Sequence, residues 1–452
     1  MPLKKNQDVE MEITGVTHDG DGVGHVEGMA VFVPRTARGD VVRVRLIKVK
    51  KSYAVGRVQE LLRPAPCRVE PDCPVFDRCG GCAWRHVTYE EELAIKRDRV
   101  RDSLQKIAGL FVEPEPTVPS PRVDHYRNKA QIPVGKEGNT LLVGFYARHS
   151  HRIVECVGCR LQPTGFDRLL AAFRRWVEQS GVEIYDEATG KGQLRHLYLR
   201  SAQATGQRLA CVVVTRFPVP RPELLVRLLR EAGAAGVLRN RNPAATNVIL
   251  GDTCVTLWGR ARITDILCGL RLEISPLAFY QVNHDQTEQL YRAVGELAGL
   301  TGREHVLDLY CGAGAIGLTL ARRAARVTGV EIVPQAVEDA RRNAALNRIG
   351  NAEFFCEDAQ AAAVRLVRSG QAPDVVVVDP PRKGLAAPTI ASIRALSPQR
   401  VVYVSCDPAT LARDLAAFTK GGYVCRRVRP FDMFPRTPHV ECVCLLERSM
   451  KE

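Results

Sequence analysis

The pattern of hydrophobic and polar positions in residues 8 to 62 predicts a small unit made of strands. Short runs rich in β-branched residues are separated by turns rich in glycine and aspartate; the runs are VEMEITGV, MAVFVP, VVRVRLIKV and YAVGRVQEL. Such spacing is typical of short strands joined by tight turns. A five-stranded β-barrel of the OB type would accommodate them. We therefore expect a first domain over residues 1–62.

The middle of the chain, residues 63–270, combines helical and strand periodicity. After a proline-punctuated linker at residues 61–66, the segment 89–110 repeats apolar side chains at helical spacing. Beyond residue 125, candidate strands such as LRHLYLRSA and RLACVVVTR alternate with candidate helices such as FDRLLAAFRRWVEQSG. We expect a small central α/β domain here, and we expect the helix 89–110 to pack on the last domain.

From about residue 271, strands and helices alternate regularly. Apolar β-branched runs (HVLDLY, RVTGVEI, AEFFCED, DVVVVDPP and RVVYVSCDP) are separated by amphipathic segments such as VPQAVEDARRNAALNRIG. This alternation predicts a parallel, doubly wound α/β sheet over residues 271–452. The closing run VECVCLLE predicts a last strand. If that strand is antiparallel, its first residue lies at the edge where the parallel strands end.

Charge and composition narrow the class of partner. The 64 Lys and Arg residues outnumber the 50 Asp and Glu residues, which gives a net charge of +14 and favours a polyanionic partner. No run approaches the ~18 apolar residues of a membrane span. The first residues, MPLKKNQDVEMEIT, lack an apolar signal core. We therefore expect a cytoplasmic protein that does not interact with membranes.

Residues 41–59 contain no acidic residue, but they contain six basic ones and Tyr53. On alternating strand positions, these residues would form a basic face with an aromatic ring, suited to a nucleic-acid backbone and a stacked base. A solvated basic strand explains the same pattern equally well.

A glycine-rich turn follows the first strand of the last domain. In HVLDLYCGAGAIG, Asp308 ends the strand, and Gly312, Gly314 and Gly317 precede a helix. Glu331 ends the next strand, 331 − 312 = 19 residues further on, where a carboxylate can accept hydrogen bonds from both hydroxyls of a ribose. NAD and S-adenosylmethionine share this adenosine-ribose geometry, so the glycines alone do not distinguish them.

The next motif favours a methyl donor over a hydride donor. DVVVVDPPRKG ends its strand in Asp379-Pro380-Pro381. This turn resembles the acidic or amide loop with two prolines that many methyltransferases hold beside the transferred methyl group. Hydride transfer has no need of such a loop, although a simple strand-terminating turn would also give this sequence.

Cys406 and Glu441 suggest a specific reaction. RVVYVSCDP puts Cys406 at the carboxyl end of its strand, where ligands collect in open α/β sheets, and Glu441 begins the last strand. Carbon 5 of uracil attacks a sulfonium methyl poorly. A thiolate that adds to carbon 6 activates carbon 5, and a base must then remove the carbon-5 proton. Cys406 fits the nucleophile and Glu441 the base.

The cysteines also suggest a metal site. Fifteen cysteines in a chain without a signal peptide are expected to be reduced thiols. Cys73-x5-Cys79-x2-Cys82 and the later Cys156-x2-Cys159 could supply four thiolates to an iron–sulfur cluster or to zinc. Zinc would use the two C-x2-C pairs, whereas Cys67 has no assigned role.

Taken together, the motifs resemble the S-adenosylmethionine-dependent RNA uracil-5 methyltransferases. The similarity extends over nearly the whole chain and is strongest to the subgroup with an N-terminal TRAM domain and a four-cysteine cluster, whose members modify 23S ribosomal RNA. The motifs are CPVFDRCGGCAWRH, YRNKAQIPV, FYQVNHDQTEQLY, LDLYCGAGAIGL, VVDPPRKG, VSCDPATLARD and DMFPRTPHVE. The implied fold is a Rossmann-like methyltransferase domain with an N-terminal OB-type TRAM barrel and a small central iron–sulfur α/β domain.

The resemblance implies roles for individual residues. The ligands of a [4Fe–4S] cluster would be Cys73, Cys79, Cys82 and Cys159, and the cluster would shape the RNA-binding region. The contacts to the methyl donor would come from Gln281, Tyr310, Glu331 and Asp379, with Asp358 near the adenine. Cys406 would be the nucleophile and Glu441 the base. Two positions depart from the family pattern, Ala315 and Trp84, and at Trp84 we expect altered RNA stacking.

The resemblance implies 23S ribosomal RNA as the substrate, with no obligate protein partner. Three alternatives stay open: the same reaction on a transfer RNA uridine, a non-catalytic iron–sulfur protein that binds RNA during ribosome assembly, and an NAD-dependent oxidoreductase.

Overall fold

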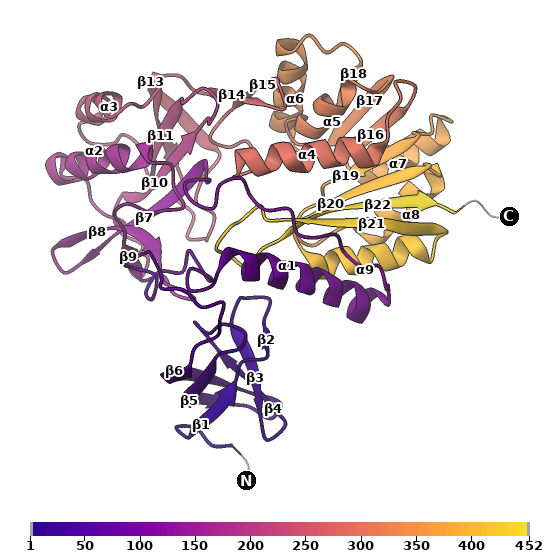
Figure 1. Ribbon diagram of the computed structural model, residues 1–452. Helices are drawn as coiled ribbons and strands as arrows, with labels where there is room; N and C mark the ends of the chain where they lie inside the picture. The colour runs from indigo at the N-terminus through magenta and orange to yellow at the C-terminus, as the bar shows by residue number, and fades with distance from the viewer. Residues whose placement is uncertain (1–2, 450–452) are drawn as a thin grey trace.

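The computed structural model describes residues 3–449 and contains three large sheets, one for each region of the chain (Figure 1). The N-terminal sheet extends from the rest of the molecule at the bottom of Figure 1. The central and C-terminal sheets lie next to each other and form the main body.

The N-terminal sheet has six strands in the order β1-β5-β6-β4-β3-β2. Their bounds are β1 Asp8–Glu12, β2 Gly15–Val16, β3 Gly22–Val26, β4 Met29–Val33, β5 Val41–Val49 and β6 Tyr53–Arg63. Alternate residues of β5, namely Val42, Val44 and Leu46, are fully buried, as the period of a strand requires. The sequence predicted five strands, and the sixth is the two-residue β2.

Helix α1, Tyr89–Ser103, connects the first sheet to the last one, and a π-helical turn over Leu104–Ala108 follows it. Thr88 caps its first turn by accepting a hydrogen bond from the N–H of Glu91. Val100 and Leu104 are fully buried in a core that they share with helix α9, Pro408–Thr419. The first long helix is therefore part of the packing of the C-terminal sheet (Figure 1).

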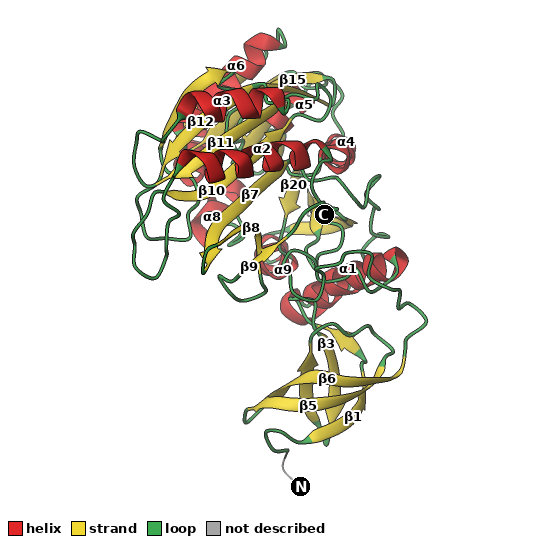
Figure 2. Cartoon of the chain, turned by 90° about the vertical axis from the view of Figure 1, so that its left-hand side faces the viewer, coloured by secondary structure: helices red, strands yellow, loops and turns green. Residues whose placement is uncertain are grey.

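The central sheet has the order β13-β12-β11-β10-β7-β8-β9. Its strands are β7 Lys129–Glu137, β8 Thr140–Tyr146, β9 Ile153–Glu155, β10 Leu194–Ser201, β11 Arg208–Val214, β12 Gly236–Arg241 and β13 Thr253–Gly259. Helices α2, Gly165–Ser180, and α3, Pro222–Glu231, cover one face (Figure 2). Every residue of β10 is buried, because its other face packs against the C-terminal part of the chain.

The C-terminal sheet confirms the predicted parallel, doubly wound arrangement. Its order is β18-β17-β16-β19-β20-β22-β21. The first five strands are parallel, whereas β22 is antiparallel to both neighbours. The strands are β16 His305–Leu309, β17 Arg326–Glu331, β18 Ala352–Cys356, β19 Val375–Val378, β20 Arg400–Ser405, β21 Tyr423–Phe431 and β22 Glu441–Arg448.

Helices cover both faces of this sheet. One face carries α4 His284–Ala298, α5 Ala315–Ala321 and α6 Pro334–Leu346, and the other carries α7 Ala359–Arg368, α8 Ala387–Leu396, α9 and α1. A hairpin of β14, Ile263–Leu267, and β15, Leu270–Ile274, leads from the central sheet into α4. Its position between the two sheets brings residues of both to one site.

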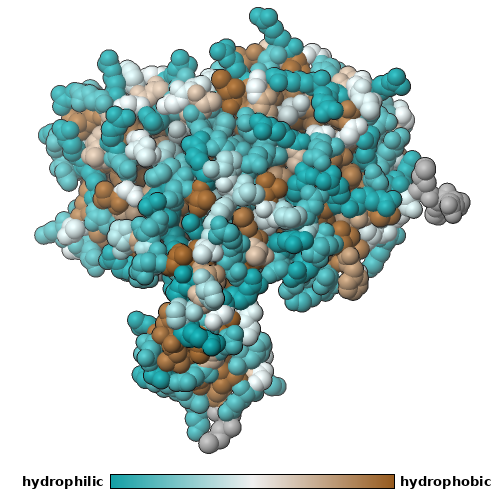
Figure 3. Space-filling view, viewed as in Figure 1, coloured by the Kyte–Doolittle hydropathy of each residue, from teal (hydrophilic) through white to brown (hydrophobic). Residues whose placement is uncertain are grey.

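The surface seen in Figure 3 is mostly hydrophilic, and its hydrophobic residues form small groups. Within residues 3–449, no helix has the length and the apolar character needed to cross a membrane.

Candidate active site

The carboxyl edge of the C-terminal sheet holds a cavity of about 780 Å³. The sequence had indicated seven residues for the methyl donor and the chemistry, and all of them line this cavity: Gln281, Tyr310, Glu331, Asp358, Asp379, Cys406 and Glu441. We refer to this space as the reaction cavity. Its lining comes from the ends of five strands and from the segment before α4, as expected for ligand sites in open α/β sheets.

The glycine-rich turn between β16 and α5 fixes Glu331. The N–H of Gly312 donates to one carboxylate oxygen of Glu331 at 3.1 Å, and the N–H of Val333 donates to the other at 2.9 Å. Gly314 has a φ of 80°, and an added Cβ there would lie 2.9 Å from the ring of Phe354. Because two backbone donors hold the Glu331 carboxylate, its remaining lone pairs face a ligand in a fixed direction.

Asp308, in strand β16, also holds the glycine-rich turn in place. It is fully buried, and its carboxyl accepts a hydrogen bond of 2.9 Å from the N–H of Gly317. Burial raises the pKa of Asp308 to about 8. Its second carboxyl oxygen has no partner among residues 3–449. At neutral pH this carboxyl is therefore largely protonated.

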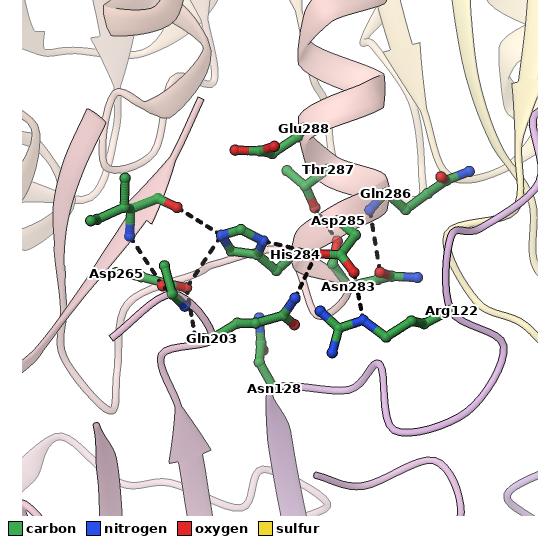
Figure 4. A network of polar contacts seen from close by, with 12 residues as sticks. Arg122, Asn128, Gln203, Asp265, Asn283, His284, Asp285, Gln286, Thr287 and Glu288 are labelled. Carbon is green, nitrogen blue, oxygen red and sulfur yellow. Dashed lines mark hydrogen bonds and ion pairs between the residues drawn. The ribbon is translucent and has the colours of Figure 1, made fainter. Parts of the chain in front are cut away.

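The segment that carries Gln281 is held by the central domain. The side-chain amide of Asn128 donates to the Gln281 carbonyl at 2.7 Å, and its backbone N–H donates to the Val282 carbonyl at 2.9 Å. Asn283 then caps helix α4 by accepting from the N–H of Gln286 (Figure 4). The placement of Gln281 in the reaction cavity therefore depends on a residue outside the C-terminal domain.

A buried carboxylate, Asp265 of β14, strengthens this connection. It is fully buried and accepts hydrogen bonds from the backbone N–H groups of Gln203 and Ala204 and from the hydroxyl of Tyr280. Tyr280 itself lines the reaction cavity. Figure 4 shows Asp265 on one side of His284 and Asp285 with Arg122 on the other, and Gln203 donates hydrogen bonds to both aspartates. Sequence reasoning missed Asp265, because an isolated aspartate in a hairpin carries no motif.

Cys406 and Glu441 lie on neighbouring strands. Ser405 of β20 pairs with Cys442 of β22, so the next residue of one strand and the preceding residue of the other face the same end of the sheet. Cys406 is half-buried and Glu441 is buried. Burial, together with the neighbouring Glu441 and Asp379, raises the pKa of the Cys406 thiol to about 11, and Arg382 opposes this rise. Arg382, from the motif DPPRKG, is thus the cation that favours the thiolate.

The two carboxyls of the cavity do not ionise independently. Burial raises the pKa of Asp379 to about 7. Burial, reinforced by Asp379, raises the pKa of Glu441 well above its ordinary value. Arg382 opposes the rise at Glu441 but does not cancel it, so the pair keeps at least one proton at neutral pH.

Cations surround the mouth of the reaction cavity at His439. Burial, together with nearby Arg382, Arg99, Lys96 and Arg127, lowers the pKa of His439 to about 4. Arg99 also donates to the Pro438 carbonyl at 2.6 Å. His439 is therefore a neutral imidazole with three arginines nearby that favour an anion, whereas Lys96 is already neutralised by Glu92 and Asp432.

A second cavity of about 380 Å³ meets the first at His439, and we call it the junction cavity. Its basic lining comes from the N-terminal domain through Arg35 and from the central domain through Arg127, Arg148 and His149. Asp19 also lines it. The three domains therefore meet in one basic hollow beside the reaction cavity.

The cysteines that the sequence indicated gather at one small cavity of about 120 Å³. It is lined by Cys73, Cys79, Cys82, Cys156 and Cys159. These include the four residues expected to bind a [4Fe–4S] cluster and also the two C-x2-C pairs that would bind zinc. In the described part of the chain, no three His, Cys, Asp or Glu side chains are grouped so that they could hold one metal ion. The five thiols share one hollow, and an iron–sulfur cluster or a zinc ion there stays a prediction.

Cys159, which lines this cavity, and Cys67, which does not, differ in their surroundings. A hydrogen bond with the Cys156 thiol and bonds from the N–H groups of Leu161 and Gln162 lower the pKa of Cys159 to about 6. Cys67 lies elsewhere, in a small core beside Trp84 and Val87, and its thiol donates to the Arg38 carbonyl.

The loop that carries the first cysteines is fastened to the N-terminal domain. The guanidinium of Arg35 donates to the carbonyls of Phe76, Cys79 and Cys82 at 2.6–3.1 Å. At its other side, the N–H of Ala83 donates to the Arg436 carbonyl. The cysteine loop therefore connects the first domain to the segment that leads into Glu441.

Two expectations for the N-terminal half need correction. Trp84 is only 2% exposed, and its indole N–H donates to the Gly20 carbonyl, so it cannot stack on RNA. On β5, Arg43 forms ion pairs with Glu10 and Glu60, and Arg45 pairs with Asp8. Acids on neighbouring strands thus neutralise part of the predicted basic face.

Comparisons with known proteins agree with this architecture. A family model described as tRNA (Uracil-5-)-methyltransferase matches residues 271–449, and a TRAM domain model matches residues 2–59. An uncharacterized RNA methyltransferase of Listeria monocytogenes is 43% identical over 98% of both chains. Another of Clostridium tetani is 41% identical over 99% of this chain and 97% of its own.

A solved structure also resembles the whole chain. The tRNA (uracil-54, C5)-methyltransferase of Pyrococcus abyssi, in complex with S-adenosyl-L-homocysteine, superposes with a TM-score of 0.79 at 28% identity. The match covers 97% of this chain and 100% of that one.

Proposed function

Since the chain belongs to the RNA uracil-5 methyltransferases that use S-adenosylmethionine, we propose that it methylates carbon 5 of a uridine in 23S ribosomal RNA through a covalent bond to Cys406. The observation that carries this proposal is the common position of Cys406, Glu441 and Asp379 in one cavity with the glycine turn and Glu331.

Each residue of the cavity has a chemical task. S-adenosylmethionine, when bound, supplies an electrophilic methyl group. Glu331 would hold the ribose hydroxyls, and Gln281, Tyr310 and Asp379 would line the space around the methionine portion, with Asp358 near the adenine. Asp358 accepts from two N–H groups through Oδ1 as the cap of α7, which leaves Oδ2 to accept from a ligand.

The covalent steps follow from the positions of Cys406 and Glu441. The thiolate of Cys406, favoured by Arg382, bonds to carbon 6 of the uracil, and carbon 5 then takes the methyl group. Glu441 removes the proton from carbon 5, and the bond between sulfur and carbon 6 breaks as the double bond re-forms. A sulfonium cation beside the two carboxyls would lower their pKa values, so that Glu441 would be an ionised carboxylate able to take up the carbon-5 proton.

The basic residues around His439 support RNA as the partner, since Arg382 lines the reaction cavity, Arg127 lines the junction cavity, and Arg99 lies near enough to lower the pKa of His439. A phosphate that flanks an extruded uridine would meet these cations first. We propose a cytoplasmic location because RNA is the proposed substrate.

We further propose that Cys73, Cys79, Cys82 and Cys159 hold a [4Fe–4S] cluster that shapes this region. The shared cavity and its thiol lining support it. Arg35 ties the same loop to the N-terminal domain, so a cluster there would stiffen the contact between domains.

A transfer RNA uridine is the second candidate substrate. The structural similarity to the Pyrococcus abyssi enzyme, whose name specifies uracil 54 of tRNA, favours it. The N-terminal TRAM domain together with the cysteine cavity favours 23S ribosomal RNA through the resemblance described above.

Methyl transfer to total RNA from a strain that lacks the gene tests the proposal. The protein and labelled S-adenosylmethionine should produce 5-methyluridine, which mass spectrometry of separated 23S and transfer RNA fragments would locate. Label in transfer RNA alone would favour the second candidate. Binding of RNA without methylation would support an assembly factor, and retention of NAD without S-adenosylmethionine would support an oxidoreductase.

A further inference from the structure

The central domain has a cavity of its own, which neither the proposed chemistry nor the cysteine site uses. It measures about 510 Å³ and lies between strands β7 to β9 and residues 184–188. We call it the central cavity. Its volume is within the ~300–1,000 Å³ range of small-ligand sites.

Its lining favours a planar, uncharged group over a phosphate. The rings of Tyr146, His151 and Tyr185 line it. The charged lining residues are balanced, three acidic and three basic: Glu137, Asp186, Glu187, Lys136, Arg152 and Arg195. Balanced charge gives little attraction for an anion, whereas aromatic rings provide faces on which a nucleobase stacks.

The ring of Tyr185 is held rigidly. The guanidinium of Arg195 lies 4.9 Å from the ring centroid of Tyr185, and it donates to the carbonyls of Asn242, Ala244 and Thr246. Because Arg195 is buried, its guanidinium stabilises the Tyr185 ring and is not free to bind a ligand from solvent. A rigid aromatic wall loses little conformational entropy when a base stacks on it.

Glu187 provides a hydrogen-bonding edge. Its carboxylate accepts from the hydroxyl of Tyr146 at 3.3 Å and pairs with Nδ1 of His151 at 2.6 Å. A carboxylate has about four lone-pair positions, so roughly two remain for a ligand. His196, which is 5% exposed, also lines the cavity, and its buried Nδ1 has no partner within residues 3–449.

The wall of the central cavity is linked through the backbone to the cysteine loop and to the junction cavity. The Tyr146 carbonyl accepts from the N–H of Gly80 in the cysteine loop, and Arg148, two residues further, lines the junction cavity. The junction cavity meets the reaction cavity at His439. To reach Tyr146, an RNA strand with a uridine at Cys406 would therefore have to run past the junction cavity and the cysteine loop.

From these observations we propose that the central cavity binds an unpaired guanine of the substrate RNA, and that this contact helps to select the target. This inference rests on the proposed function. Guanine presents two adjacent N–H donors, N1 and N2, which match the two free acceptor positions of a carboxylate, whereas adenine and uracil lack such a pair. The stacking wall is Tyr185.

Glu187→Gln tests the inference, because the amide keeps the shape but replaces one acceptor with a donor. We expect the KM for total RNA from a strain lacking the gene to rise roughly 5- to 100-fold, the worth of one bidentate base contact. The KM for S-adenosylmethionine and the kcat should stay within about twofold of the unmodified protein, since the reaction cavity is untouched. Glu178→Gln, an exposed residue of α2, is the matched control.

Photo-crosslinking provides a second, independent measurement. Transcripts of 23S ribosomal RNA and of the transfer RNAs that contain 6-thioguanosine should crosslink to peptides with Tyr146, His151 or Tyr185, and more strongly than transcripts with 4-thiouridine. Equal crosslinking by both, or a Glu187→Gln variant that behaves as Glu178→Gln does, overturns the inference. If the unmodified protein methylates no RNA, the proposed function fails, while the crosslinks still report on guanine.

Discussion

Cys406 and Glu441 are brought together by the antiparallel pairing of β20 with β22, in which Ser405 lies opposite Cys442. The thiol ends one strand and the carboxyl begins the other, so a single register sets their separation. A shift of one residue would turn Glu441 to the other face of the sheet. The pair therefore provides the basis for the first two predictions.

Replacing the thiol should abolish catalysis while preserving the fold. For Cys406→Ser we expect methyl transfer to fall by a factor on the order of 10³ or more, as in other enzymes that lose a covalent nucleophile. Substrate RNA with 5-fluorouracil at the target should form an adduct with the unmodified protein that survives denaturing electrophoresis, and Cys406→Ser should form none. Cys67→Ser is the control, because Cys67 lies away from the reaction cavity. An adduct with Cys406→Ser would show that another residue attacks.

Removing the base should stop the reaction at a later stage. In Glu441→Gln the thiolate can still add and the methyl group can still transfer, but the carbon-5 proton has no acceptor. We expect methylated RNA to accumulate covalently bound to protein, at near-stoichiometric levels, with turnover reduced on the order of 10²-fold or more. Glu338→Gln, exposed on α6, should turn over normally. Free, fully methylated RNA released at the normal rate by Glu441→Gln would contradict this role.

The rate of adduct formation should rise with pH. Burial raises the pKa of the Cys406 thiol to about 11, so the reactive thiolate is the minor form at pH 7 and becomes more abundant as pH increases. Arg382 favours the thiolate, so Arg382→Gln should slow adduct formation by about tenfold at pH 7.5, and it should move the profile to higher pH. Stopped-time assays with 5-fluorouracil RNA between pH 6.5 and 9.5 measure this, with Arg303→Gln as the control. An unshifted profile would mean that another group stabilises the thiolate.

The stability of the ligand-free protein should depend on Asp308. Its pKa is raised by burial to about 8, whereas an unfolded chain has a value of ~3.9, so the folded state holds its proton more tightly. This stabilisation is complete below about pH 4 and is lost as the pH rises through about 8. We expect Asp308→Asn to narrow the difference in Tm between pH 5.5 and 8.5 by roughly 3 °C or more.

Calorimetry of the two proteins at both pH values measures this change in Tm. Asp252→Asn, at an exposed position, should leave the difference as it is in the unmodified protein. An equal pH dependence in Asp308→Asn and the unmodified protein would mean that Asp308 is ionised in the fold.

Iron content should separate the two neighbouring cysteines. Protein purified without oxygen should be brown and hold about four irons if a [4Fe–4S] cluster is present. Cys159→Ser should lose most of this iron, whereas Cys156→Ser, from the same cavity, should retain it. Iron analysis and the visible absorption spectrum provide the measurement. Colourless protein with one zinc ion would reverse the assignment of the metal.

Much of the C-terminal domain could be predicted from the sequence because its signals are local. The parallel strands end in GAG, DPP and SCDP, and the ends of parallel strands meet at one edge, so these residues were expected to be close. Their chemical roles stay predictions, since the arrangement shows position only. The strand order, in which β22 lies between β20 and β21, sets the distance from Cys406 to Glu441.

Other features have no local signal. Asn128 and Asp265 fix the segment around Gln281. Asn128 is 153 positions from Gln281, and Asp265 is 62 positions from its partner Gln203, so no local motif marks either residue. The neutralisation of Arg43 depends on Glu10 of another strand, which the composition of residues 41–59 cannot reveal. The burial of Trp84 likewise depends on the loop at Gly20.

The buried ion pair of Lys96, in helix α1, limits how far the protein can be truncated from its N-terminus. Its ammonium is fully buried between the carboxylates of Glu92 and Asp432, and Asp432 precedes the segment that ends at Glu441. A truncation to residues 271–452 would remove that cation and leave the buried Asp432 carboxylate without its ion-pair partner. It would also remove Val100 and Leu104, which pack against α9. The part that matches the methyltransferase family model is thus not a detachable module, and a minimal version of this protein must begin before Tyr89.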